Sequence, residues 1–189
     1  MRFGLYDKPI NDEVSKYKGL YRENELIDFC EKSNSILTNM IEWFFSQSRD
    51  GMHIKYTEEN MNKMVQFLDM LRDEKWKGEL LLFTDDRELE IPFGFELIGY
   101  DICADSMYYS PLGDGFLTSY IQSETFFNEM SLENYRDYAK NLNNFGLFKS
   151  YVVAEEFAKY CNKINSLYPH TIESEENWRP FMIYSWMNG

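Results

Sequence analysis

The stretch ELLLFTDDRELEIPFGFELIGYDIC, residues 79–103, contains the strongest strand signals of this chain. It opens with ELLLFTD, a short apolar run bounded by turn residues, which is typical of a buried strand. A bend is expected at Pro92 and Gly94, and the alternating residues that follow predict a second strand over Phe95–Cys103. A sheet is therefore expected in the middle of the chain.

Amphipathic helices are expected on both sides of these strands. Apolar residues recur at helical spacing from about Glu23 to Gln47, where SNS at residues 33–35 is a candidate interruption. The same spacing recurs in SYVVAEEFAKYCNKINSLYP, and Pro169 is its expected stop. Both segments predict helices with one apolar face toward the sheet.

The clearest helix is predicted in TEENMNKMVQFLDMLRDEKW, residues 57–76. Thr57 together with Asn60 makes an N-cap, and the two glutamates of the first turn suit the positive end of the helix dipole. Methionine, valine and leucine recur at helical spacing along the segment. Gly78 is expected to end this helix.

Further strands and one short helix complete the predicted fold. Strands are expected in RFGLY near the N-terminus, in FLTSYIQ at residues 116–122 and in RPFMIYSWM near the C-terminus, and a short helix is expected from Ser131 to Asn141. SRDGMH, residues 48–53, indicates a turn. Strands in the middle with helices before and after predict an α+β fold, a central antiparallel or mixed sheet covered by several amphipathic helices. The length predicts a single globular domain over residues 1–189.

The charge of the chain restricts its partners. The sequence has 32 acidic against 19 basic residues, a formal net charge of −13. Such a charge repels nucleic-acid phosphates and anionic membranes and attracts a basic protein. No apolar run has the ~18 residues of a membrane span, and no signal peptide is recognised at the N-terminus. The expected partner is a basic protein, the expected location is the cytoplasm, and neither nucleic acid nor membrane is an expected partner.

The sequence offers no convincing catalytic or metal motif. Cys30, Cys103 and Cys161 are far apart, and His53 and His170 are isolated in turn-like surroundings. No GxSxG turn, phosphate-binding glycine loop or CxxC pair is present. We therefore expect no catalytic residue, no metal and no cofactor, and we expect a protein that is not an enzyme.

The best candidate for a functional surface follows the predicted strand 95–103. Acidic residues and tyrosines alternate where this strand enters a turn, and a tyrosine ring beside a carboxylate suits arginine and lysine side chains. The predicted partner contacts here are Asp101, Asp105, Tyr108, Tyr109 and Asp114. A second candidate patch comprises Glu173, Glu175, Glu176 and Trp178.

The segment FELIGYDICADS, residues 95–106, followed shortly by a glycine-containing turn, resembles bacterial immunity proteins. These proteins neutralise polymorphic or contact-dependent growth-inhibition toxins, and a small acidic α+β chain without a catalytic signature is similar to them in general character. The resemblance implies a non-enzymatic inhibitor that binds a cognate toxin domain, commonly a nuclease or another hydrolase. It implies that the toxin is covered at its active site or on an adjacent face.

Two alternatives remain open. Asp85, Asp86, Asp101 and His170 could build a small metal- or carboxylate-dependent hydrolase, since such sites need carboxylates from separate elements. The chain could also be an acidic regulatory subunit of a cytoplasmic complex. A regulatory subunit would share the acidic surface of an immunity protein, but the gene for its partner would lie elsewhere in the genome.

Overall fold

The structure, a computed structural model, describes residues 1–7, 35–47, 53–76, 78–103, 140–143, 145, 147–167 and 177–187. In this part of the chain, a five-stranded antiparallel sheet has the order β2-β1-β3-β5-β4, and three helices accompany it. The predicted α+β class with an antiparallel sheet and helices is confirmed. No helix in these ranges combines the length and the apolar character that crossing a membrane requires.

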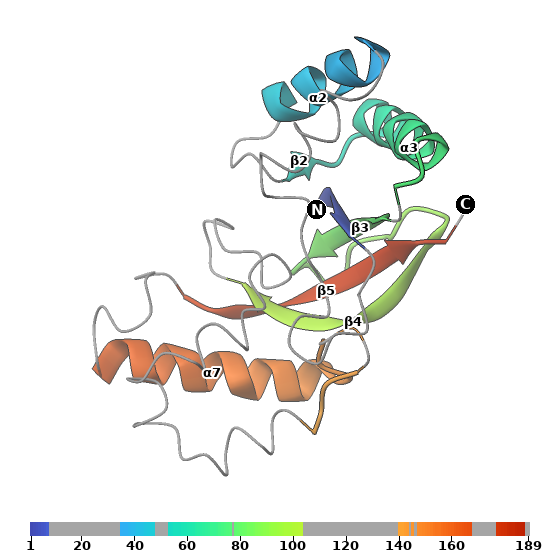
Figure 1. The fold of residues 1–189 in the computed structure, drawn as a ribbon. Coiled ribbons are helices and arrows are strands. Elements are labelled where there is room, and N and C mark those ends of the chain that lie inside the picture. The colour runs from blue at the N-terminus through green and yellow to red at the C-terminus, as the bar shows by residue number, and fades with distance from the viewer. Residues whose placement is uncertain are drawn as a thin grey trace.

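The sheet brings together strands from both ends of the sequence (Figure 1). The strands are β1 (Arg2–Asp7), β2 (Ile54–Lys55), β3 (Gly78–Thr84), β4 (Phe95–Cys103) and β5 (Arg179–Trp186). Strand β5 pairs antiparallel with both β3 and β4, so β3 and β4 run in the same direction on its two sides. The connection between them must therefore carry the chain back from the level of Met182 in β5, which pairs with Thr84, to the level of Trp186, which pairs with Phe95. We call this segment, residues 85–94, the crossover connection.

Helix α3 (Glu58–Asp73) begins as its sequence predicts but ends earlier. The backbone N–H of Asn60 donates to Thr57 Oγ1 at 3.1 Å, which confirms the predicted N-cap. The helix does not extend to Gly78, because Lys75 adopts a left-handed φ of 70°. The N–H groups of Lys75 and Trp76 then donate back into the last turn, to Arg72 O at 2.8 Å and Leu71 O at 2.9 Å. Gly78 instead begins β3.

Two separate cores lie on the two faces of β3. Leu80 and Leu82 belong to a core that includes residues of α2 (Ser35–Gln47) and α3, whereas Leu81 and Phe83 belong to a second core with residues of β5. This burial on both faces explains the continuous apolar sequence of the strand. Its predicted position, from the ELLLFTD run, is confirmed.

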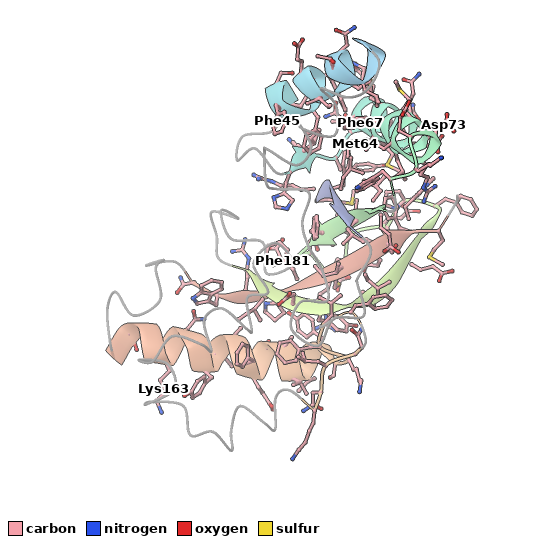
Figure 2. All side chains as sticks on the ribbon, in the orientation of Figure 1. Phe45, Met64, Phe67, Asp73, Lys163 and Phe181 are labelled. Atoms are coloured by element: carbon pink, nitrogen blue, oxygen red, sulfur yellow. The ribbon has the colours of Figure 1, made fainter. Side chains whose placement is uncertain are left out.

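The helices lie at opposite ends of the molecule in Figure 1, with α2 and α3 beside β1–β3 and α7 (Tyr151–Leu167) along β4 and β5. Met64 and Phe67 are fully buried on the side of α3 that faces α2 and the sheet (Figure 2). The ring of Phe67 lies 6.2 Å from that of Phe44 in α2. On α7, the exposed Lys163 points away from the sheet.

The predicted strands at residues 2–6, 95–103 and 179–187 are confirmed, as is the helix that precedes Pro169. The short strand β2 was not predicted. It is only two residues long, so it carries no periodicity and exists because β1 pairs with it. The predicted helical residues 23–34, the strand at 116–122 and most of the helix from Ser131 lie outside the described residues.

Candidate partner-binding surface

Most of the predicted partner contacts lie outside the described residues. These are Asp105, Tyr108, Tyr109, Asp114, Glu173, Glu175 and Glu176. Their role stays a prediction. The two predicted contacts within the described ranges, Asp101 and Trp178, are 3% and 2% exposed.

Asp101 is a buried carboxyl group near the end of β4. Its Cα pairs with that of Phe181 in β5, and its Oδ1 accepts a hydrogen bond of 2.7 Å from the backbone N–H of Ile102. Burial raises the pKa of Asp101 well above its usual range, and the bond from Ile102 opposes this shift without cancelling it. The folded chain therefore presents no exposed carboxylate at Asp101, and contact with a partner would require this strand end to open.

Trp178 is held against α7 by Asn162. The side-chain amide of Asn162 donates to Trp178 O at 2.8 Å, and the backbone N–H of Trp178 donates to Asn162 Oδ1 at 2.7 Å. This two-way bond joins the segment that enters β5 to the middle of α7. Sequence reasoning missed Asn162. A sequence feature could have pointed to it: asparagine has a low helix propensity, and its presence inside a strongly predicted helix is often explained by a side-chain hydrogen bond.

The crossover connection is acidic and shaped by its own side chains. Asp85 Oδ2 lies 2.6 Å from Arg179 Nε at the start of β5. Thr84 Oγ1 accepts from the N–H of Asp86 at 3.1 Å, and Asp86 Oδ1 accepts from the N–H of Glu88 at 3.0 Å. Asp85 and Asp86, proposed above as carboxylates of a hydrolase, thus orient the first turn of this connection.

Arg87 in the crossover connection contacts a cluster of tyrosines that sequence reasoning missed. Its guanidinium group lies 4.4 Å from the centre of the Tyr151 ring in α7, within cation–π range. The Tyr151 ring in turn lies 5.8 Å from that of Tyr100 in β4, edge to face. Burial, and secondarily the neighbouring Tyr100, raise the pKa of Tyr184 in β5. Only the packing of α7 and the crossover connection on β4 brings these residues together.

Exposed apolar side chains gather where β4 begins and β5 ends. Phe93 is 92% exposed, Met187 is 53% exposed and Leu97 is 45% exposed. The backbone N–H of Met187 donates to Gly94 O at 2.8 Å, which fixes the C-terminal strand beside the turn that carries Phe93. Sequence reasoning assigned no role to these residues. The sequence feature that could have pointed to them is Phe93, an aromatic residue inside a predicted bend.

A short hairpin covers part of the outer edge of β4. Phe148 exchanges backbone hydrogen bonds of 3.0 and 2.8 Å with Tyr100. Asn143 Nδ2 donates to Ile98 O at 2.6 Å, and Asn143 Oδ1 accepts from two N–H groups of its own turn, at 2.9 and 3.2 Å. Edge groups of a sheet invite pairing with other chains, and this hairpin satisfies several of them.

Within the described ranges, no group of three or more histidine, cysteine, aspartate or glutamate side chains is arranged to hold a metal ion. His53 is 2% exposed, and its ring packs edge to face on Phe83 with 5.1 Å between ring centres. His170 lies outside these ranges. A metal site that includes His170 stays an alternative prediction.

Comparison with known proteins found no match: no family model, no curated protein and no solved structure is similar to this chain.

Proposed function

We propose that this protein is a non-enzymatic inhibitor of the immunity type, which binds and neutralises a basic cognate toxin. The observation that carries the proposal is the excess of uncompensated negative charge. The formal net charge is −13, and between residues 85 and 96 five carboxylates accompany one guanidinium group, a local formal charge of −4. The resemblance of residues 95–106 to bacterial immunity proteins supports the toxin as the kind of partner.

The negative charge acts before contact. A field of one sign accelerates the approach of an oppositely charged protein, and this acceleration weakens as salt screens the charges. Carboxylates that are not already paired are the ones available to the partner. Asp85 is paired with Arg179, but in the described part of the chain the exposed Glu88, Glu90 and Glu96 have no cation within ion-pair distance. The charge excess thus supports fast capture of a basic protein.

A genetic and biochemical experiment tests the proposal. The gene directly upstream of this one is expressed alone and together with the gene for this chain, and growth of the host is followed. We expect the upstream product alone to arrest growth, and co-expression to restore growth through a stoichiometric complex. The proposal is wrong if the upstream product is harmless or if growth stays arrested. A complex with a harmless protein encoded elsewhere would support the alternative of an acidic regulatory subunit.

A further inference from the structure

We infer that Phe93 is an anchor of the partner-binding surface and receives an arginine or lysine side chain of a basic protein partner. This inference rests on the proposed function and adds to it a second contact region. Of the predicted contacts in this part of the sequence, the described Asp101 lies near the end of β4, whereas Phe93 precedes its beginning. Asp101 and Phe93 are therefore separated by most of the length of the strand.

The position of Phe93 is fixed although its side chain is exposed. Gly94, with a left-handed φ of 92°, turns the chain into β4. The N–H of Phe95 donates to Pro92 O at 3.4 Å across this turn, and the N–H of Met187 donates to Gly94 O. Phe95, just after the turn, is 9% exposed and packs on Trp186 with 5.1 Å between ring centres. A rigid base thus presents a 92% exposed aromatic ring, which loses little conformational entropy on binding.

Phe93 has apolar neighbours that extend the contact area. Met187 is held to the same turn by its backbone bond, and Leu97 is the third residue of β4. Methionine adapts its shape to a partner more readily than branched side chains do. These three exposed residues are too few for a stable interface alone, but they match the apolar centre of one.

The acidic residues near Phe93 in the sequence favour a cationic occupant. Glu90 lies three residues before Phe93 and Glu96 three residues after it, and both are exposed. A cation can lie over the face of the ring while its N–H groups donate to these carboxylates. An arginine or lysine also covers the ring with the methylene groups of its side chain. An exposed aromatic ring with an exposed carboxylate three residues to either side of it in the sequence therefore suits a cationic side chain.

A second copy of this chain is a poor occupant for the same reason. Self-association would bring together two chains of formal charge −13 and would oppose Glu90 and Glu96 to identical carboxylates. Like charges placed opposite each other disfavour an interface. The charge argument thus selects a basic heterologous partner.

The test measures binding of the C-terminal domain encoded by the upstream gene to immobilised protein at several salt concentrations. We expect F93A to accelerate dissociation at least about tenfold, as is common when a central aromatic anchor is removed. We expect the double variant E90Q/E96Q to slow association several-fold and to flatten its salt dependence. V152A is the matched control, because Val152 is also an exposed apolar residue, 60% exposed, but belongs to α7.

The outcomes separate the two proposals. Failure of the unaltered protein to bind the domain would refute the proposed function and the Phe93 surface with it. Binding that F93A leaves unchanged would refute the Phe93 surface while the proposed function stands. Equal losses in F93A and V152A would also refute a specific role of Phe93. Thermal unfolding of F93A checks its fold, and we expect no change because the side chain is 92% exposed.

Discussion

Replacing Asn162 by alanine tests whether a pair of hydrogen bonds holds the segment before β5 on α7. The substitution removes both bonds to the backbone of Trp178, of 2.8 and 2.7 Å. Each such bond contributes about 1 kcal/mol net, so their loss costs about 2 kcal/mol. Alanine is the better helix former by about 0.5 kcal/mol. The expected net loss of unfolding free energy is about 1.5 kcal/mol, or roughly tenfold in the unfolding equilibrium constant.

The measurement is urea unfolding followed by tryptophan fluorescence. Trp178 itself is a suitable reporter because it is 2% exposed in the folded chain. The control is N62A, which makes the same substitution at an exposed position in the second turn of α3. We expect N62A to gain a few tenths of a kcal/mol from helix propensity alone. Equal stability of N162A and N62A would refute the assigned role of Asn162.

The variant N162D separates the two bonds. An aspartate still accepts from the N–H of Trp178, but at any pH above its own pKa it is ionised and places a second oxygen against Trp178 O. We expect N162D to be less stable than N162A at pH 7, because the carboxylate faces a carbonyl oxygen without a proton between them. Protonation near pH 3 restores a donor and should recover part of the loss. A pH-independent difference between the two variants would contradict this geometry.

Three further substitutions test other parts of the structure. Because burial raises the pKa of Asp101 in the folded chain, the folded state binds more protons than the unfolded state above pH ~4, and stability falls as the pH rises toward the folded pKa. The variant D101N keeps the acceptor oxygen but cannot ionise, so its stability should lack this pH dependence. Unfolding of D101N and of the unaltered protein at pH 4 to 8 measures the difference. N143A removes the hydrogen bond to Ile98 O and two bonds within its turn, and should raise hydrogen exchange of the edge of β4, with unchanged exchange as the contrary result. G99A places a Cβ 2.7 Å from Leu147 Cβ, at a residue whose φ is 153°. This crowding should lower the free energy of unfolding, measured in urea, by about 1–3 kcal/mol. Unchanged stability would show that the hairpin can move away.

Local signals in the sequence correctly predicted several elements. Thr57 caps α3, the bend at Pro92 and Gly94 precedes β4, and the observed bounds of β4 are those of the predicted strand. These features depend on residues within a few positions of one another, so a linear pattern carries them. The end of α3 was predicted wrongly because glycine is the usual left-handed residue, whereas here Lys75 takes that conformation before Gly78 is reached.

The candidate surface depends on contacts that no linear pattern carries. Asn162 and Trp178 are 16 residues apart, and Asn143 and Ile98 are 45 residues apart. The direction of β4 relative to β3 follows from the insertion of β5, the last strand of the described chain, between them. Acidic residues and tyrosines could be found in the sequence, but not which of them packing would bury.

The sequence alone determined the acidic character, the α+β class, the start of α3 and the bounds of β4, because composition and short-range patterns specify them. Only the tertiary structure decided that Asp101 and Trp178 are buried while Phe93 is exposed. An aspartate and a tryptophan lose solvent when distant strands and helices pack over them, and a phenylalanine stays exposed when its turn lies beyond the covered sheet. Exposure is thus a property of the assembled layers rather than of residue type.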